Sequence, residues 1–126
     1  MENNVSLWLG NFSSEDDLEE YMDVKYTKDG DSVPSQFEKD FKLGYYDRDL
    51  IEKDWIEVAE NNIHDLLIDF SYDNQLIPQF KVIQKKYNTI ILIYNYDYKQ
   101  EKSFLNTTVK DAYEVDFIGV AKYRDE

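Results

Sequence analysis

The sequence predicts a single α+β domain in which a sheet of three to five strands packs with about four helices. Two observations predict this class. Some stretches alternate apolar and polar side chains in the two-residue period of a strand, and others repeat apolar side chains at helical spacing. The chain has 126 residues, of which 42% are hydrophobic, and this length supports one ordinary core but not two. We therefore expect residues 1–126 to form one domain.

The first half of the chain predicts a strand, two helices and a turn. Residues 5–9 (Val-Ser-Leu-Trp-Leu) alternate as in a strand. Ser13 or Ser14 is expected to cap a helix whose acidic first turn suits the helix dipole. Residues 28–31 (Lys-Asp-Gly-Asp) predict a turn. A capping box of the type S-x-x-E begins at Ser35 and predicts a second short helix.

From residue 50 onward, alternation, helix caps and helical spacing again predict the elements. Residues 50–58 are expected to form a strand, although their alternation is imperfect, and Asn61 or Asn62 can cap a third helix. A fourth helix is expected to place Leu76, Phe80, Ile83 and Tyr87 on one face.

The clearest strand is expected at residues 89–98. Its first half is apolar on both faces, which indicates a central place in the sheet. A loop at residues 99–107 and a final strand at residues 114–123 complete the expected fold.

The net charge of −13 restricts the partners of this protein. Residues 1–62 carry 17 acidic and 6 basic side chains, whereas residues 63–126 carry 10 and 8. Such a field repels nucleic acids and anionic membranes and attracts basic proteins. The 11 tyrosines add aromatic faces on which Arg and Lys side chains can stack. We expect a basic protein partner, no nucleic acid and no membrane.

The chain contains no cysteine, which excludes disulfides and thiolate metal sites and fits a reducing compartment. The longest apolar run, residues 90–94, is far too short to span a bilayer, and no basic and apolar leader opens the chain. We expect a cytoplasmic protein.

The sequence offers few residues for catalysis. The single histidine, His64, lies within an apolar helical pattern and is interpreted as structural, and no nucleophile elbow or phosphate-binding glycine loop is present. The carboxylates around Gly30 do not match a calcium loop, because this glycine lies between two acids and position 36 is Gln. We expect no catalytic residue, metal or cofactor. A small carboxylate-dependent enzyme stays as a lesser alternative.

Several motifs in order resemble one bacterial family. They are the W-x-G-N-F sequence at 8–12, the acidic helix after it, the Asp29-Gly30-Asp31 turn, and residues 34–41 and 46–49. Together they resemble an immunity family of polymorphic toxin systems, the immunity protein twenty-two family. The resemblance implies a non-catalytic cytoplasmic protein that binds and neutralises a cognate toxin domain, often a nuclease. A non-catalytic adaptor domain is the alternative function.

Three residues match the W-x-G-N-F motif, and we expect structural roles for them. Trp8 is expected in the core. Gly10 would permit a positive φ, and the Asn11 side chain would satisfy backbone groups at the turn between strand and helix.

The partner-binding surface is expected in the acidic first half of the chain. Nuclease domains are usually basic because they bind phosphates, so an acidic surface with aromatic anchors suits them. Trp55 is interpreted either as a core residue or as an exposed anchor surrounded by acids. The hypothesis assigns these residues to the surface: Asp29, Asp31, Tyr46, Asp47, Asp49, Glu52, Asp54 and Trp55.

Overall fold

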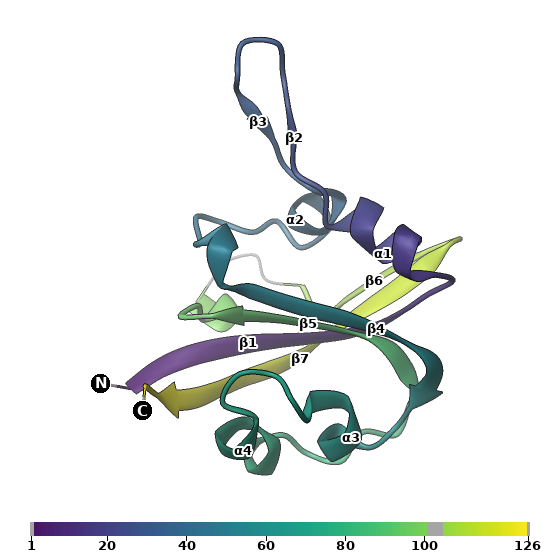
Figure 1. The fold of residues 1–126 in the computed structure, drawn as a ribbon, viewed down its shortest axis with the longest axis vertical. Coiled ribbons are helices and arrows are strands. Elements are labelled where there is room, and N and C mark those ends of the chain that lie inside the picture. The colour runs from purple at the N-terminus through teal and green to yellow at the C-terminus, as the bar shows by residue number, and fades with distance from the viewer. Residues whose placement is uncertain (1, 101–104, 126) are drawn as a thin grey trace.

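Five strands form one antiparallel sheet between two helical layers in the computed structural model, which describes residues 2–100 and 105–125 (Figure 1). The strands lie in the order β4-β5-β1-β7-β6. Their bounds are Glu2–Phe12 for β1, Ile51–Glu60 for β4, Tyr87–Tyr94 for β5, Thr107–Lys110 for β6 and Tyr113–Arg124 for β7. The expected α+β class is confirmed.

The helices are short and cover both faces of the sheet. The α-helices of the described chain are α1 Glu15–Tyr21, α2 Gln36–Asp40, α3 Ile63–Leu67 and α4 Asp73–Leu76. The 3-10 helices of the same part are η1 Arg48–Leu50, η2 Ile77–Gln79 and η3 Tyr98–Gln100. Figure 1 shows α1 and α2 on one face of the sheet and α3 and α4 on the other.

The central strand β1 divides the apolar core into two parts, because its side chains alternate between the faces. Val5, Leu7 and Leu9 pack with the residues of α3 and α4. Trp8 and Phe12 pack with those of α1 and α2. The strand extends to Phe12, beyond its expected end, because its last residues pair with the start of β7.

The expected helix starts are confirmed where a cap is present in the sequence. The Ser14 hydroxyl accepts the Asp17 N–H at 3.2 Å, and Asn62 caps α3. At α2, the Ser35 hydroxyl accepts the Glu38 N–H at 3.1 Å, while the Glu38 carboxylate accepts the Ser35 N–H at 2.9 Å. These contacts involve residues three positions apart, so the local sequence is enough to predict them.

The expected fourth helix is present as α4, but its predicted extension through Phe80, Ile83 and Tyr87 is wrong. After α4 the apolar residues of that pattern belong to the 3-10 turn η2, which contains Pro78, to an irregular segment and to the start of β5 at Tyr87. Gln75 and Gln79 bind the outer edge of β7 in this region. The amide of Gln75 accepts from and donates to the backbone of Arg124, at 2.8 and 3.0 Å, and that of Gln79 does so with Lys122, at 2.8 and 2.6 Å. Side chains thus take the place of a neighbouring strand.

The expected loop at residues 99–107 is partly wrong. Thr107 begins β6, an edge strand that pairs with β7. Residues 101–104 of that loop lie outside the described residues.

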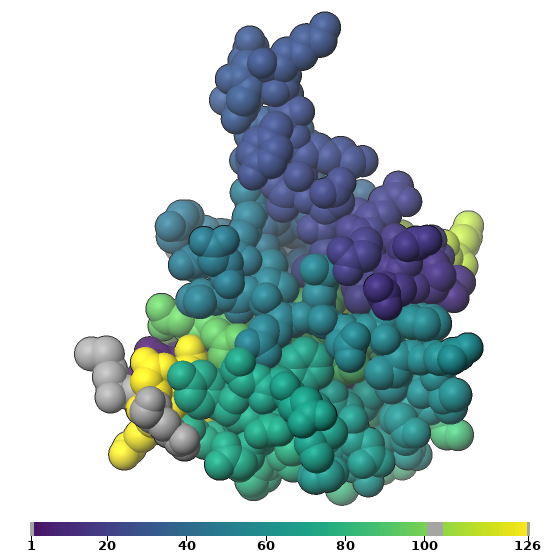
Figure 2. Space-filling view, in the orientation of Figure 1, coloured from purple at the N-terminus to yellow at the C-terminus, as the bar shows by residue number. Residues whose placement is uncertain are grey.

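A small hairpin projects from the α1 and α2 face (Figures 1 and 2). Its strands, β2 Lys25–Tyr26 and β3 Ser32–Val33, pair with each other and not with the main sheet. The expected turn at 28–31 is confirmed, with Gly30 at a φ of 88°. No helix in the described part of the chain is long and apolar enough to cross a membrane.

Within the described part of the chain, several tyrosine hydroxyls have raised pKa values, because burial disfavours the phenolate and because neighbouring carboxylates repel it. They belong to Tyr21, Tyr46, Tyr87, Tyr94, Tyr113 and Tyr123. Examples are the bonds from Tyr113 to Asp40 and from Tyr87 to Asp116, both 2.6 Å. Above pH about 10, the folded protein therefore keeps hydroxyl protons that the tyrosines of the unfolded chain release.

This difference predicts alkaline unfolding. Tyrosines in the unfolded chain ionise near pH about 10, so the stabilising contribution is complete below that pH and is lost as the pH rises above it. Urea unfolding at pH 8 to 11.5, followed together with tyrosinate absorbance, is expected to show most phenolates appearing with the loss of structure. Ionisation of these six hydroxyls near pH 10 in a folded protein would contradict the prediction.

Candidate functional site

Acidic side chains are concentrated in one of the two helical layers. Residues 13–50, which include α1, α2 and the hairpin, carry 12 acidic and 5 basic side chains, a net charge of −7. Residues 61–86, which include α3 and α4, carry three of each. Because these segments cover opposite faces of the sheet, one face of the protein is strongly acidic and the other is neutral. We call the face formed by residues 13–50 the acidic face.

Helix α1 is the most acidic element of this face. Five of its seven residues are exposed acids, while Leu18 and Tyr21 are buried against the sheet. Glu19 and Glu20 lie in the last turn, where the helix dipole disfavours negative charge, and this turn contains no basic residue of its own. Of the five α1 acids, only Glu19 forms an ion pair within the described residues, with Lys53 at 3.8 Å.

These α1 acids were not included in the surface expected from the sequence. The helix dipole explains the acids of the first turn alone. The signal that could have identified them is the continuation of the run into the last turn, as Glu-Asp-Asp-Leu-Glu-Glu.

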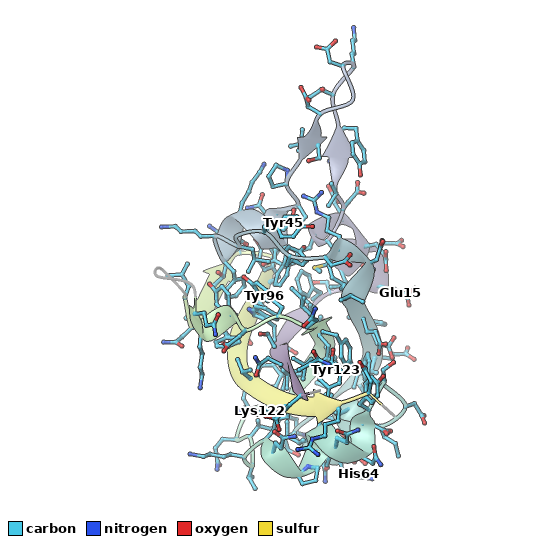
Figure 3. All side chains as sticks on the ribbon, turned by 90° about the vertical axis from the view of Figure 1, so that its left-hand side faces the viewer. Glu15, Tyr45, His64, Tyr96, Lys122 and Tyr123 are labelled. Atoms are coloured by element: carbon cyan, nitrogen blue, oxygen red, sulfur yellow. The ribbon has the colours of Figure 1, made fainter. Side chains whose placement is uncertain are left out.

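A hollow of about 560 Å³ lies beside the hairpin, between its base, α2 and the loop of residues 43–49. Its lining includes Pro34, Tyr45, Asp47 and Asp49. Tyr45 is 96% exposed, which is unusual for a large aromatic side chain. Figure 3 shows Tyr45 on the hairpin side of the molecule and His64 at the opposite end.

The loop that carries Tyr45 is held to α2 by Glu38, whose side chain is 5% exposed. Its carboxylate accepts the Tyr46 hydroxyl at 2.5 Å and the Arg48 guanidinium at 2.8 and 3.1 Å. Burial favours a higher pKa for Glu38, but the hydrogen bonds from Arg48, Tyr46 and the Ser35 N–H outweigh it and lower the pKa. The carboxylate therefore stays ionised and positions the loop.

The structure brings together part of the surface expected from the sequence. Tyr46, Asp47 and Asp49 line the hollow described above, although the Tyr46 hydroxyl is already bound to Glu38. Asp29 and Asp31 lie in the turn of the projecting hairpin, on the same face of the molecule.

The remaining three expected residues lie on β4 and do not join this group. The Glu52 carboxylate accepts the backbone N–H of Ser71 at 3.0 Å and also its hydroxyl, so it points toward the layer of α3 and α4. Asp54 is exposed two residues further along this edge strand. Trp55 is half-buried against the core beneath α1 and α2, and its indole N–H donates to the Phe12 carbonyl at 3.0 Å.

Two residues of the W-x-G-N-F motif behave differently from what was expected. The left-handed φ expected of Gly10 is absent, since the described glycines with positive φ are Gly30 and Gly119. Gly10 instead allows close strand contact, because a Cβ there would lie 2.6 Å from the Glu114 carbonyl oxygen. Asn11 does satisfy backbone groups, but those around the start of β5: its amide donates to the Lys86 carbonyl at 3.1 Å and accepts the Asn88 N–H at 3.0 Å.

No group of three or more His, Asp or Glu side chains that could hold a metal ion occurs among the described residues. His64 is exposed beside Asp65, with the ring nitrogen 3.3 Å from the carboxylate. The fold and surface define a small α+β domain with one acidic and one neutral face.

Comparison with protein families identifies the chain more closely. Residues 5–124 match the model described as Immunity protein 22, so the chain belongs to that family. The resemblance found in the sequence is thus confirmed, and the family implies a protein that neutralises a cognate toxin. No curated protein and no solved structure matches the chain.

Proposed function

We propose that this protein is a non-catalytic inhibitor that neutralises a basic toxin domain by binding it with the acidic face. The observation that carries the proposal is the division of charge, −7 on the layer of residues 13–50 and zero on the layer of residues 61–86. A nuclease is the favoured class of toxin, because its substrate site must attract phosphates and is therefore basic.

The state of the acidic side chains supports this proposal. Four of the five acids of α1 have no ion-pair partner within the described part of the chain, and the side chains of Asp29, Asp31 and Asp49 make no hydrogen bond there either. Free carboxylates repel one another and weaken the folded state, unless a cationic partner offsets the repulsion. They also accelerate encounter with such a partner. The absence of cysteine fits a cytoplasmic location, where a producing cell would need this protection.

Co-expression with the reading frame adjacent to this gene tests the function. We expect the protein to restore growth of cells that make the toxin domain and to co-purify with it. Absence of both rescue and complex would refute the proposal.

A matched pair of charge reversals tests the surface. Asp16 and Asp65 are both exposed acids in the first turn of a short helix, but they lie on opposite faces of the sheet. Asp16→Lys is expected to slow association with the toxin domain by about threefold to tenfold at low salt and to weaken the salt dependence, because a charge at an interface acts on the encounter rate. Asp65→Lys should change neither. Equal rates for the two variants in stopped-flow measurements would show that the acidic face is not the binding surface.

A further inference from the structure

The β2–β3 hairpin stands away from the domain (Figures 1 and 2). All side chains of residues 25–32 are exposed. The turn is held by its own hydrogen bonds, from the Thr27 N–H to the Asp31 carbonyl at 2.8 Å and from the Gly30 N–H to the Thr27 carbonyl at 3.0 Å. Within the described residues, no hydrogen bond or ion pair joins residues 27–31 to the rest of the protein. The hairpin therefore adds little to the stability of the domain.

The form of the hairpin matches a concave partner. A narrow ribbon can bury both of its faces only inside a cleft, and enzyme active sites are clefts. Tyr26 is 68% exposed on this ribbon. Asp29 and Asp31, on either side of Gly30 at the tip, have side chains without a partner in the described chain. In a cleft that binds phosphates, these two carboxylates can take the positions of phosphate groups.

The surface on either side of the hairpin base is hollowed. The hollow of about 560 Å³ on one side reaches Pro34 and contains Tyr45, Asp47 and Asp49. A second hollow of about 330 Å³ on the other side also reaches Pro34, and it contains Asp17, Glu20 and Asp23 beside α1. A partner cleft that encloses the hairpin would place one lip in each hollow. Each hollow is lined by three acidic and two basic side chains, so both present a small excess of carboxylates to a lip that carries Lys or Arg.

We infer that the β2–β3 hairpin enters the cationic, phosphate-binding active-site cleft of the toxin, whose two lips bind in the hollows beside the hairpin base. The inference rests on the proposed function and specifies its mechanism. The hairpin blocks the active site, and the two hollows supply additional affinity. Inhibition is then competitive with the toxin's substrate.

A shortened hairpin separates blocking from binding. In this variant residues 26–32 are replaced by Asn-Gly, a two-residue turn that connects Lys25 to Val33, the strand pair nearest the domain. Its probe is the toxin domain of the adjacent reading frame. We expect an unchanged melting temperature, an affinity reduced by about tenfold to a hundredfold, and a bound toxin that keeps most of its activity at saturating inhibitor. A shortened variant that binds and inhibits like the wild type would overturn the inference.

The double variant Asp29→Asn and Asp31→Asn keeps the hairpin and removes its charge. We expect weaker inhibition and slower association, whereas Asp65→Asn on the opposite face should have no effect. If the shortened variant fails to fold, unchanged inhibition by this double variant would overturn the inference. A wild-type protein that binds no toxin domain would instead refute the proposed function, so the two failures are distinguishable.

Discussion

Replacing Trp8 by alanine is expected to lower the free energy of unfolding by about 3–5 kcal/mol, the usual cost of removing a buried large aromatic side chain. Trp8 is 0% exposed. Its ring packs edge-on against Phe37, with the ring centroids 5.0 Å apart. The centroids of the Tyr98 and Phe117 rings both lie 5.3 Å from that of Trp8. The change would leave a cavity beneath α2, where the core supports the acidic face. The free energy of unfolding of a natural domain is about 5–15 kcal/mol in total, so the variant should be close to unfolding.

Urea unfolding followed by circular dichroism measures this effect. Trp8→Phe is the control, because it keeps an aromatic ring in the same position and is expected to cost roughly 1–2 kcal/mol. The indole N–H of Trp8 has no hydrogen-bond partner among the described residues, so phenylalanine loses no hydrogen bond there. A cost below about 1 kcal/mol for Trp8→Ala would show that this part of the core is loosely packed.

Replacing Gly10 by valine is the second change with a large expected effect. A Cβ at this position would lie 2.6 Å from the Glu114 carbonyl oxygen, and 3.2 Å from the Val115 side chain. The closest atom belongs to the backbone of β7, which is paired with β1, so the strain cannot be relieved by a rotamer change. Overpacking of this kind costs about 1–3 kcal/mol, and we expect the upper end of that range because the sheet itself must shift.

The melting temperature of Gly10→Val, compared with Gly44→Ala, measures this effect. Gly44 is exposed in the loop after α2 and is not among the described glycines with positive φ. Its replacement should therefore stay within about 0.5 kcal/mol. Equal stability of the two variants would contradict close contact between β1 and β7 at Gly10.

The features that could be predicted depend on residues close together in the sequence. The caps at Ser14, Ser35 and Asn62 act over three residues, and the structure contains all of them. The two-sided apolar run of β5 indicated an interior strand, and β5 lies between β4 and β1. In these places local preference and tertiary packing agree.

The features that could not be predicted depend on distant partners. The segment with Phe80 and Ile83 has helical spacing, but it packs as irregular chain because Gln75 and Gln79 bind the edge of β7. Likewise, β6 forms because β7 offers a free edge beside Thr107. Neither partner can be recognised from the short segment itself.

The candidate site divides in the same way. The sequence identified an acidic first half that contains Asp29, Asp47 and Asp49, all of them exposed. It did not show that Glu38 is bound to Arg48 or that Glu52 turns toward Ser71. Sequence spacing does not reveal which carboxylates are already bound within the fold, because those partners come from other elements.

By itself, the sequence determined the α+β class, the helix caps, the central apolar strands, the acidic charge and the motifs of the family. Only the tertiary structure decided where the charge lies. Residues 13–50 connect β1 to β4 across the face that carries Trp8, while residues 61–86 connect β4 to β5 across the face that carries Leu7. The side taken by each connection depends on which strand face buries its apolar residues, and this choice sets the charged layer apart from the neutral one.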